Sequence, residues 1–496
     1  MEGADMMDSQ SNIIQTIPRL LEQYRESESP ALLCGDEVLS YRALLADARK
    51  IASGIRARGV RKGDRVVLTV KRGTDYVRAW LGVLYAGAVQ VTFHDGWPKH
   101  LLASAAEDCR PSLFLDGADV RELLASPELP EDCGIPAELL GEDPFQIVYT
   151  SGSTGTPKGV VNCHLTAVSR TSAAHGDPLP LYFSQHCDRL LLDCSLGFVL
   201  SSYCLCLCLL NGKTVVLARK EDIRTPQTLS ECARRHRADT IHISPSRFQQ
   251  HRDDPAFAGL LRDMRLVMAG SEAISGRTAR LLTEAAGNEA VFCYGASELF
   301  GPALYCFASA YRGGDVAFFP PPSCENVLVL NESRQPAETG ERGELCFGGI
   351  PGALGRYFGT RAASSPAFFE HPAFGRLYLT GDLALRQEDG GIRILGRRDS
   401  MVKLYGIRVE PEAVESAFLS CPGIRQAAVK VLGEGSEARL WAWYSTSGSV
   451  EEPALRRHLS QRLPNYMIPS FLVRMKELPL NQSGKLDWGA LTQIPD

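Results

Sequence analysis

The 496-residue sequence lacks several features that would assign it to a specialised class of protein. It has no excess of positive charge, because its net charge is −5, and this argues against nucleic acid as the main partner. Its first residues lack the basic and apolar regions of a signal peptide. The fifteen scattered cysteines are therefore expected to be reduced thiols of a cytoplasmic protein.

Long hydrophobic runs are also scarce. One stretch, residues 190–210 (LLLDCSLGFVLSSYCLCLCLL), is long enough to cross a bilayer and holds a single charge, Asp193. A charge inside a bilayer is costly, and no comparable second run exists, so we expect a buried strand followed by a buried helix and no membrane partner. Cys204, Cys206 and Cys208 alternate with leucines, and this apolar setting favours core residues over zinc ligands.

The first part of the chain alternates strand patterns with helix patterns, and its length calls for more than one core. Residues 64–70 (DRVVLTV) predict a buried strand, and residues 75–88 (DYVRAWLGVLYAGA) predict a helix that ends at a glycine. The segments KTVVLA, DTIHIS and RLVMAG repeat the strand pattern, and residues 225–236 predict another helix. This alternation predicts an α/β fold of parallel sheets flanked by helices, with ligands beyond the carboxyl ends of the strands.

The pattern changes after about residue 320. Hairpin-like runs with glycine turns predict a β-rich module that completes a large N-terminal domain, residues 1–398. A small α+β C-terminal domain, residues 399–496, is expected to follow. It includes a helix over residues 412–419, strands at RQAAVKVL and RLWAWYS, and a helix at EEPALRRHLSQRL.

A loop rich in glycine, serine and threonine follows a strand pattern at residues 150–159 (TSGSTGTPKG). It does not match the P-loop pattern G-x4-G-K-[ST]. Backbone N–H groups and hydroxyls of such a loop can still donate to phosphate oxygens, and glycines allow close approach. Considered alone, the loop is equally compatible with a flexible surface segment.

The residue order is more specific than the composition. YTSGSTGTPKG resembles the phosphate-loop signature of the adenylate-forming superfamily, which includes amino-acid-activating domains of nonribosomal peptide synthetases, D-alanine–carrier protein ligases, acyl-CoA synthetases and luciferases. Other signatures of that superfamily follow in order along nearly the whole chain. They are LSYRALLADA (39–48), LYAGAVQV (84–91), LDCS (192–195), YGASE (294–298), GELCFGG (343–349), YLTGDLA (378–384), GRRDSMVKLYGIRVEPEAVE (396–415), LPNYMIP (463–469) and NQSGKLD (481–487).

The resemblance implies adenylation, in which a carboxylate attacks the α-phosphate of ATP and pyrophosphate leaves. The carboxylate is already a nucleophile, so the protein must neutralise charge and align the reactants. The resemblance puts Lys485 between the substrate carboxylate and the α-phosphate, and it assigns Glu298 to Mg²⁺ on the ATP phosphates. The plainer alternatives are a solvated lysine in a polar turn and an acid at a helix start.

Further nucleotide contacts are implied by matching positions. Tyr294 is expected near the adenine, whereas Asp382 and Arg397 are expected near the ribose hydroxyls. The alternatives are a core tyrosine and a turn aspartate. The expected ATP-binding residues are Thr150, Ser151, Gly152, Ser153, Thr154, Gly155, Lys158, Tyr294, Gly295, Ser297, Asp382, Arg397 and Lys485. Thr150, Ser151 and Thr154 are the expected phosphate donors, and Lys158 is expected to be an auxiliary phosphate or loop-stabilising contact.

The resemblance also implies movement of the small domain. Asp399 matches the hinge of the family, and its alternative is a cap or a partner of a nearby arginine. One orientation would bring Lys485 to the substrate, and the other would present the KLYGIRVE loop, with Gly406, to a thiol acceptor.

Asp193 bears most on the substrate. Amino-acid-activating relatives keep an aspartate here for the α-ammonium, and a buried carboxylate needs a cationic partner that an amino acid brings. The alternative is a helix N-cap. Leu192 stands where the family usually has an aromatic residue. The substrate pocket carried over by matching is Asp193, Cys194, Gly197, His242, Val267, Ala269, Cys293, Gly301 and Pro302.

The chain stops eleven residues after Lys485. We therefore expect a freestanding enzyme that transfers its aminoacyl group to the phosphopantetheine thiol of a separate carrier protein. Two other functions stay open. One is a carboxylic acid–CoA ligase, which Asp193 disfavours, and the other is a degenerate nucleotide-binding scaffold, which the retention of Glu298, Asp382 and Lys485 disfavours.

Overall fold

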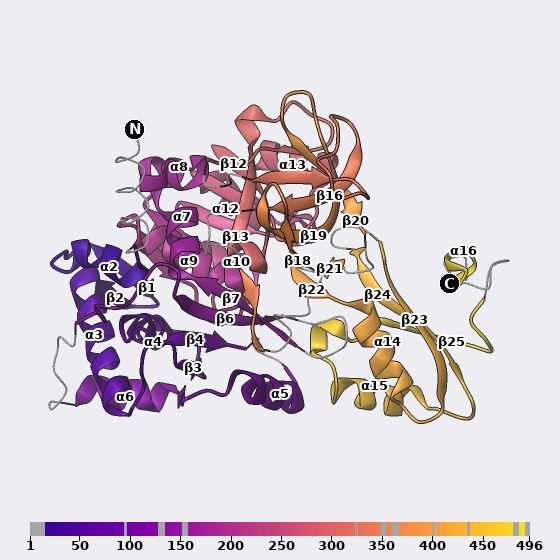
Figure 1. Cartoon of the computed structure of the whole chain (residues 1–496), viewed down its shortest axis with the longest axis horizontal. Coiled ribbons are helices and arrows are strands. Elements are labelled where there is room, and N and C mark those ends of the chain that lie inside the picture. The colour runs from indigo at the N-terminus through magenta and orange to yellow at the C-terminus, as the bar shows by residue number, and fades with distance from the viewer. Residues whose placement is uncertain are drawn as a thin grey trace.

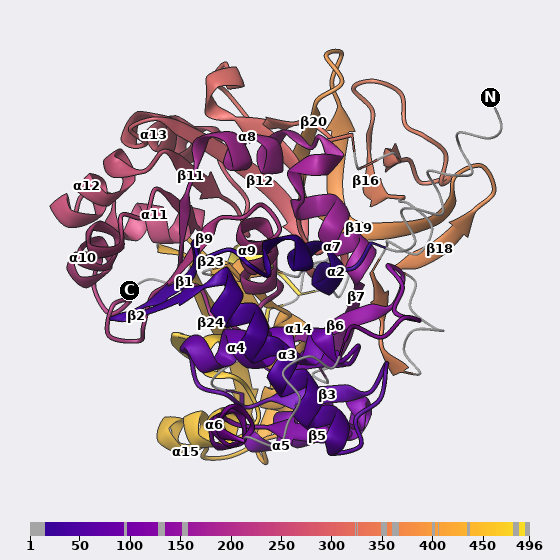
Figure 2. The same cartoon turned by 90° about the vertical axis from the view of Figure 1, so that its left-hand side faces the viewer.

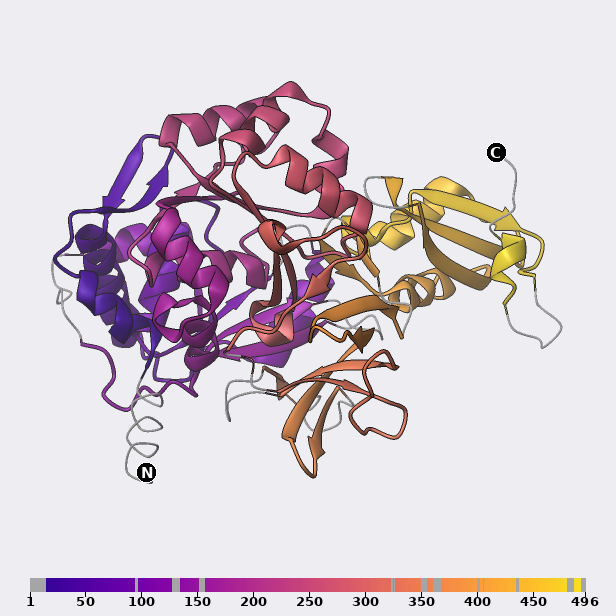
Figure 3. The same cartoon turned by 90° about the horizontal axis from the view of Figure 1, so that it is seen from above.

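The computed structural model describes most of the chain. The described residues are 15–93, 97–126, 134–150, 157–322, 324, 326–348, 355–359, 367–398, 402–404, 406–433, 437–479 and 486–491. Within them a large N-terminal part and a smaller C-terminal part lie side by side (Figure 1), and the smaller part projects away in the view from above (Figure 3). This confirms the predicted fold class. The domain boundary at residue 399 stays a prediction, because Asp399 lies outside the described residues.

The first sheet of the N-terminal part has eight strands. Its interior strands are parallel, as predicted, whereas the strands at both edges pair antiparallel with their neighbours. In spatial order the strands are β13 (Gly301–Phe307), β12 (Glu289–Ala296), β11 (Leu266–Ala269), β10 (Thr240–Ile243), β8 (Arg189–Leu192), β9 (Thr214–Leu217), β1 (Pro30–Cys34) and β2 (Glu37–Ser40).

The second sheet has six strands and the same mixed character. Parallel pairings join β6, β4, β3 and the edge strand β5, whereas β7 pairs antiparallel with both β6 and β17. In spatial order the strands are β17 (Arg356–Tyr357), β7 (Lys158–Cys163), β6 (Pro144–Thr150), β4 (Val89–Thr92), β3 (Arg65–Leu68) and β5 (Leu113–Leu115).

Helices α3 (Tyr41–Ala57) and α4 (Thr74–Tyr85) lie between these two sheets, as Figure 2 shows. Helix α3 contacts β1 and β2, while α4 contacts β1, β3 and β4. Apolar residues at helical spacing form their buried faces. A Cβ at Gly82 would meet Ile51 Cγ2 at 2.4 Å, so only glycine allows this close helix contact.

The long apolar run forms a strand and a helix, as predicted. Its first residues are in β8, and its last are in α9 (Val199–Leu209). Cys204, Cys206 and Cys208 are buried in the core that α9 shares with α7 (His164–Thr171). Within the described residues, no helix is long and apolar enough to cross a membrane.

Helices complete the outer layers of the large part. In α10 the Thr225 side chain caps the first turn, because its Oγ1 accepts from Thr228 N at 3.2 Å. The remaining N-terminal helices are α2 (Ile17–Leu21), α5 (Lys99–Cys109), α6 (Gly117–Ala125), α8 (Pro178–His186), α10 (Pro226–His236), α11 (Pro245–His251), α12 (Pro255–Asp263) and α13 (Gly276–Ala285).

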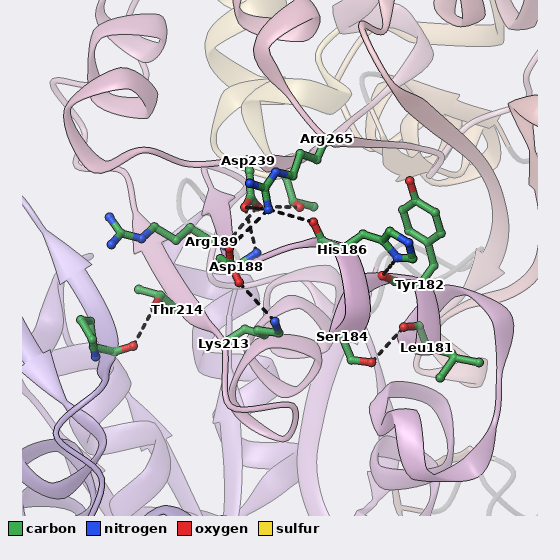
Figure 4. Close-up of polar contacts among 12 residues, drawn as sticks. Leu181, Tyr182, Ser184, His186, Asp188, Arg189, Lys213, Thr214, Asp239 and Arg265 are labelled. Carbon is green, nitrogen blue, oxygen red and sulfur yellow. Dashed lines mark hydrogen bonds and ion pairs between the residues drawn. The ribbon is translucent and has the colours of Figure 1, made fainter.

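Charged residues stand immediately before four adjacent strands of the first sheet (Figure 4). Asp239 accepts from the backbone N–H groups of Asp188 at 2.8 Å and of Arg189 at 3.0 Å. Arg265 and Lys213 each lie 3.3 Å from a carboxylate oxygen of Asp188. These contacts join the amino ends of β8, β9, β10 and β11, so the carboxyl ends are the edge that remains for ligands.

The predicted β-rich module is a third sheet. Its strands pair antiparallel, and β18 joins the sheet at one side of the long strand β19. Its strands are β14 (Ala317–Phe318), β20 (Ile392–Arg397), β19 (Gly375–Arg386), β16 (Arg342–Phe347), β15 (Val327–Leu330) and β18 (Phe368–His371).

The C-terminal part has its own core around Phe418 and Tyr444. Its described residues form a three-stranded sheet, a separate two-stranded hairpin, the two predicted helices and one further short helix. The hairpin is β21 (Val402–Leu404) and β22 (Ile407–Val409), the sheet is β23 (Ile424–Leu432), β24 (Arg439–Thr446) and β25 (Phe471–Met475), and the helices are α14 (Pro411–Leu419), α15 (Glu452–Ser460) and the short α16 (Trp488–Leu491).

Candidate active site

A cavity of about 290 Å³ lies at the carboxyl ends of the first sheet. Asp193 follows β8 directly, Ser244 follows β10, and Ser297 and Glu298 follow β12. All four line the cavity, as expected for an α/β fold. The sequence-predicted residues that line it are Thr150, Asp193, Cys194, His242, Cys293, Gly295, Ser297, Glu298, Gly301, Pro302, Asp382 and Arg397.

Some predicted site residues are described but do not line this cavity. Val267 and Ala269 belong to β11 and are fully buried in the core. Gly197 donates its backbone N–H to Ser195 Oγ at 3.3 Å. Lys158 contacts the lining residue Glu298, and Tyr294 contacts the lining residue Asp382. Predicted residues outside the described part of the chain are Ser151, Gly152, Ser153, Thr154, Gly155, Asp399 and Lys485, and their roles stay predictions.

Glu298 is a buried carboxylate at the cavity wall. It lies in a 3₁₀ turn (Ser297–Leu299), and its side chain is 2% exposed. Tyr357 Oη donates to Glu298 Oε1 at 2.8 Å, and Lys158 Nζ lies 3.8 Å from the same oxygen. Lys158 Nζ also donates to Tyr357 Oη at 3.1 Å. The lysine at the end of the glycine-rich loop is therefore linked to the predicted metal ligand through strand β17.

Asp382 is held by two groups from other strands. Tyr294 donates its hydroxyl to Asp382 Oδ2, and Arg397 Nη1 donates to Asp382 Oδ1 at 3.1 Å. Burial and the neighbouring carboxylate raise the pKa of Tyr294 well above its usual value, so the hydroxyl stays a donor. The Tyr294 ring stacks on Phe347, with centroids 6.2 Å apart, so within the described residues its contacts are with the protein core and Asp382.

Asp193 pairs with an arginine that the sequence did not single out. Arg247 Nη1, from α11, donates to Asp193 Oδ2. The Asp193 side chain is 3% exposed and that of Arg247 is 29% exposed. The helix that follows, α9, has Phe198 at its N-cap position, so Asp193 does not cap it. Arg247 is the third residue of α11 and belongs to none of the sequence motifs given above. Its contact with Asp193 follows only from the adjacent positions of β8 and β10 in the sheet.

Two other neighbours of Asp193, His242 and Cys194, carry no charge at neutral pH. Burial lowers the pKa of His242 to about 4, so its imidazole is neutral. Burial, followed by the charge of Asp193, raises the pKa of Cys194 to about 12, so its thiol is protonated. Gly301, at φ +100°, would place a Cβ 3.0 Å from the Tyr203 ring, so the cavity floor requires glycine there.

The β21–β22 hairpin of the C-terminal part also reaches the cavity. Lys403, Gly406 and Ile407 line it. Lys403 Nζ donates to Gly295 O at 3.3 Å, and Gly406 N donates to Glu272 Oε1. Helix α16, which follows Lys485 in the chain, lies at the far end of the C-terminal part in Figures 1 and 3. The hairpin and the segment after Lys485 thus lie on opposite sides of the small part.

The carboxylate ligands at the cavity fit a magnesium ion only if nucleotide phosphates also bind it. Within the described residues, no group of three or more His, Cys, Asp or Glu side chains could enclose a metal. Glu298 nevertheless presents one buried carboxylate to the cavity beside the hydroxyl-bearing Thr150. Mg²⁺ commonly uses one or two carboxylates together with substrate phosphates, so Glu298 fits a nucleotide-bound ion and not an all-protein cage.

Comparison with known proteins identifies relatives along nearly the whole chain. The model of the AMP-binding enzyme family matches residues 22–358, and that of the AMP-binding enzyme C-terminal domain matches residues 413–485. A dimodular nonribosomal peptide synthase of Bacillus subtilis (strain 168) is 31% identical over 94% of this chain. Malpibaldin synthetase of Mortierella alpina is 30% identical over 95% of the chain. The chain spans 20% and 9% of the lengths of these two relatives.

Solved structures share the fold at low sequence identity. An artificially fused adenylation–PCP di-domain, NpsA-ThdA from Klebsiella oxytoca, has a TM-score of 0.82 and 20% identity, covering 93% of this chain and 94% of that one. The o-succinylbenzoate CoA synthetase MenE from Bacillus subtilis has a TM-score of 0.82 and 21% identity, covering 97% and 99%. The amide bond synthetase McbA from Marinactinospora thermotolerans has a TM-score of 0.83 and 19% identity, covering 96% and 99%.

The AMP-binding enzyme match includes the segments that carry Thr150, Asp193 and Glu298, and the structural likeness extends over both parts of the chain. This protein therefore belongs to the AMP-binding enzymes, the adenylate-forming ligases whose signature motifs its sequence carries.

Proposed function

We propose that this protein uses ATP to activate an amino acid as aminoacyl-AMP and then transfers the aminoacyl group to the phosphopantetheine thiol of a separate carrier protein in the cytoplasm. One observation carries the proposal. A single cavity is lined by Asp193, which suits a substrate ammonium, and by Glu298, Asp382 and Arg397, which suit a nucleotide.

The first step needs cations where negative charge gathers. The amino acid carboxylate attacks the α-phosphorus of ATP, and the bond to the departing pyrophosphate breaks. Arg397 and Lys403 line the cavity, and Lys485 is the cation that we propose to act between the two reactants. Thr150 would donate its hydroxyl to phosphate oxygens, together with the loop residues that follow it.

Asp382 and Glu298 would hold the other parts of the nucleotide. Arg397 and Tyr294 each contact one oxygen of the Asp382 carboxylate and keep it oriented. The remaining lone pairs of these oxygens would accept from the ribose hydroxyls. Glu298 would hold Mg²⁺, whose charge would offset that of the phosphates.

Transfer to a thiol would use the β21–β22 hairpin. In this structure Gly406 lies at the cavity, while α16 lies at the opposite end of the small part. This arrangement suits the transfer step, because the proposed adenylation lysine precedes α16 by three residues in the chain. Rotation about the predicted hinge at Asp399 would exchange the two segments. The nonribosomal peptide synthase relatives and the adenylation–PCP neighbour support a carrier protein as acceptor.

A second candidate function is a carboxylic acid–CoA ligase. The observation that favours it is the Arg247–Asp193 ion pair, because it neutralises the buried carboxylate without any substrate ammonium. The third candidate, a degenerate nucleotide-binding scaffold, is disfavoured because Glu298, Asp382 and Arg397 all line one cavity.

Exchange of labelled pyrophosphate into ATP tests these functions directly. The panel contains L- and D-amino acids, fatty acids and aryl acids, each added to the purified full chain. Exchange that depends on an amino acid supports the proposal. Exchange with fatty or aryl acids alone would favour the CoA ligase, and no exchange with any acid would favour the scaffold.

The Asp193→Ala variant tests the ammonium contact separately. We expect the KM for the amino acid to rise at least about thirtyfold, because a charged hydrogen bond in a buried site is lost. The KM for ATP should stay within about twofold, since Asp193 follows β8, away from Asp382 on β19. Unchanged use of the amino acid would remove Asp193 from the proposed site.

A further inference from the structure

The carboxylate of Asp193 depends on a cation, because its side chain is almost excluded from water. Among the described residues, the basic group that contacts it is Arg247 Nη1, which donates to Oδ2. The pair forms because β8 and β10 are adjacent parallel strands, so the residue after β8 meets the helix that begins after β10.

Other groups around Asp193 do not pair with its carboxylate in this structure. The Arg72 guanidinium lies nearby, but it donates to the backbone carbonyls of Leu192 and Cys194. His242 and Cys194 face it in the neutral state. Arg397 and Lys403 also line the cavity but are engaged elsewhere, since Arg397 contacts Asp382 and Lys403 contacts Gly295 O. Removal of Arg247 would therefore leave Asp193 as a buried charge without its cation.

Arg247 has room to leave Asp193. A second cavity of about 380 Å³ adjoins the first, and Asp193, Ser244 and Arg247 line both. The Arg247 side chain thus stands between the two spaces and is partly open to solvent. A guanidinium that swings into the second cavity would be hydrated there and would uncover the whole Asp193 carboxylate.

We propose that Arg247 is a specificity-determining residue that occupies the position of the substrate ammonium in the empty site and yields it when an amino acid binds. This inference rests on the proposed function. An incoming ammonium must replace the guanidinium, so each amino acid binds at the cost of one ion pair. A carboxylic acid without an ammonium group leaves the Arg247–Asp193 ion pair intact. The two charges of that pair offset each other, so such an acid does not meet an uncompensated carboxylate.

The expected consequence is that the wild-type protein prefers an amino acid over its deamino analogue by only a small ratio of kcat/KM. Arg247 weakens amino acid binding by competing for Asp193, and it supports the deamino acid by neutralising Asp193. Loss of the guanidinium charge should therefore raise kcat/KM for the amino acid and lower kcat/KM for the deamino acid. A merely structural arginine would weaken both substrates equally.

The test uses pyrophosphate exchange by the full chain with the best amino acid of the panel and with its deamino analogue. Arg247→Gln keeps a hydrogen-bond donor but removes the charge, and Arg247→Met is a second neutral variant in case one of them does not fold. For both we expect the ratio of kcat/KM for the amino acid to that for the deamino acid to rise about tenfold or more. Arg247→Lys should restore most of the wild-type ratio, because a cation is present again.

Arg252→Met is the matched control. Arg252 caps the carboxyl end of the same helix and pairs with the exposed Asp253, so this variant removes the same charge without a contact to Asp193. Its ratio should equal that of the wild type. An unchanged or lower ratio in Arg247→Gln and Arg247→Met, with amino-acid-dependent exchange intact, would overturn this inference alone. Wild-type exchange with the deamino acid only would overturn both this inference and the proposed function.

Discussion

Lys158 Nζ lies 3.8 Å from Glu298 Oε1, across the hydroxyl of Tyr357. The two residues come from β7 and from the turn after β12, so this ion pair joins the two large sheets at the cavity. Both side chains are largely buried, with 17% and 2% exposure. Because the carboxylate cannot be hydrated, the lysine stabilises its charge.

Lys158→Met should therefore destabilise the protein more than the loss of a comparable lysine elsewhere. We expect the free energy of unfolding to fall by about 3 kcal/mol, because a buried carboxylate loses its cation. Denaturant unfolding measures this loss. The matched control is Lys213→Met, since Lys213 is 18% exposed but pairs with Asp188, which is 64% exposed. That variant should lose less than about 1 kcal/mol, and equal losses in the two variants would contradict the stabilising role of Lys158.

Asp382→Asn should weaken the use of ATP. The amide keeps the shape of the side chain, but Arg397 loses its carboxylate partner and the ribose loses a charged acceptor. We expect the KM for ATP to rise about thirtyfold, a change that corresponds to about 2 kcal/mol. Exchange kinetics at saturating substrate acid measure it.

Tyr294→Phe serves as the milder companion of that variant. It keeps the stacking on Phe347 and removes only the hydroxyl that donates to Asp382. The KM for ATP should rise about fivefold, as expected for one neutral donor. If Tyr294→Phe were as severe as Asp382→Asn, the nucleotide contact would lie at the tyrosine and not at the carboxylate.

Substitutions at Lys485 and Gly406 should separate the two half-reactions. Lys485→Ala should abolish formation of the adenylate, yet largely spare thiol transfer from a supplied adenylate. Gly406→Val should do the reverse. Gly406 has φ +78° and an ideal Cβ position 3.5 Å from Ser271 Cβ, so a side chain there would strain the hairpin at the cavity.

Single-turnover assays of each step would measure the separation. We expect transfer by Gly406→Val to slow at least about tenfold while exchange stays within about twofold, because strain of roughly one to three kcal/mol, as for other forced backbone conformations, acts on one orientation only. Equal loss of both steps in either variant would refute the assignment of one orientation to each step.

Stability should fall in mild acid because of buried neutral histidines. Burial lowers the pKa of His164 to about 3 and that of His242 to about 4, from an ordinary value of 6.5. Between about pH 6.5 and about pH 4 the unfolded chain binds protons that the folded protein does not, so the free energy of unfolding decreases as the pH falls. For His242 the full effect is about 3 kcal/mol.

Denaturant unfolding at a series of pH values measures this slope. His242→Gln should make the slope shallower by about one proton, because the glutamine does not titrate in this window. The same slope in wild type and variant would show that the imidazole of His242 is accessible to protons in the folded state.

Several elements of the fold are predictable from local sequence patterns. Residues 64–70 and 75–88 coincide with β3 and α4 to within a few residues, and residues 190–210 likewise coincide with β8 and α9. Each pattern reports burial within one segment, which hydrophobic spacing encodes directly. The strand order of the two large sheets is not predictable in this way, because pairing between strands far apart in the sequence, such as β1 with β9, leaves no local signature.

The candidate site shows the same division. Motifs identified Asp193, Glu298 and Asp382, and the structure brings all three to one cavity. The matched pocket also included Val267 and Ala269, whose side chains pack in the core instead. Alternation along β11 decides which face a residue occupies, and a match by position in the sequence does not resolve this.

The amino-acid sequence by itself determines the class of chemistry. Phosphate and carboxylate recognition require particular residue types at short spacing, so the order of motifs is enough to identify an adenylate-forming ligase. Which charged side chains form ion pairs with one another, in contrast, depends on the folded chain. Arg247 reaches Asp193 across 54 residues because β8 and β10 are neighbours in the sheet, and Lys158 reaches Glu298 because the two sheets share one cavity edge. Such pairs depend on strand order, a property of the whole fold and not of any segment.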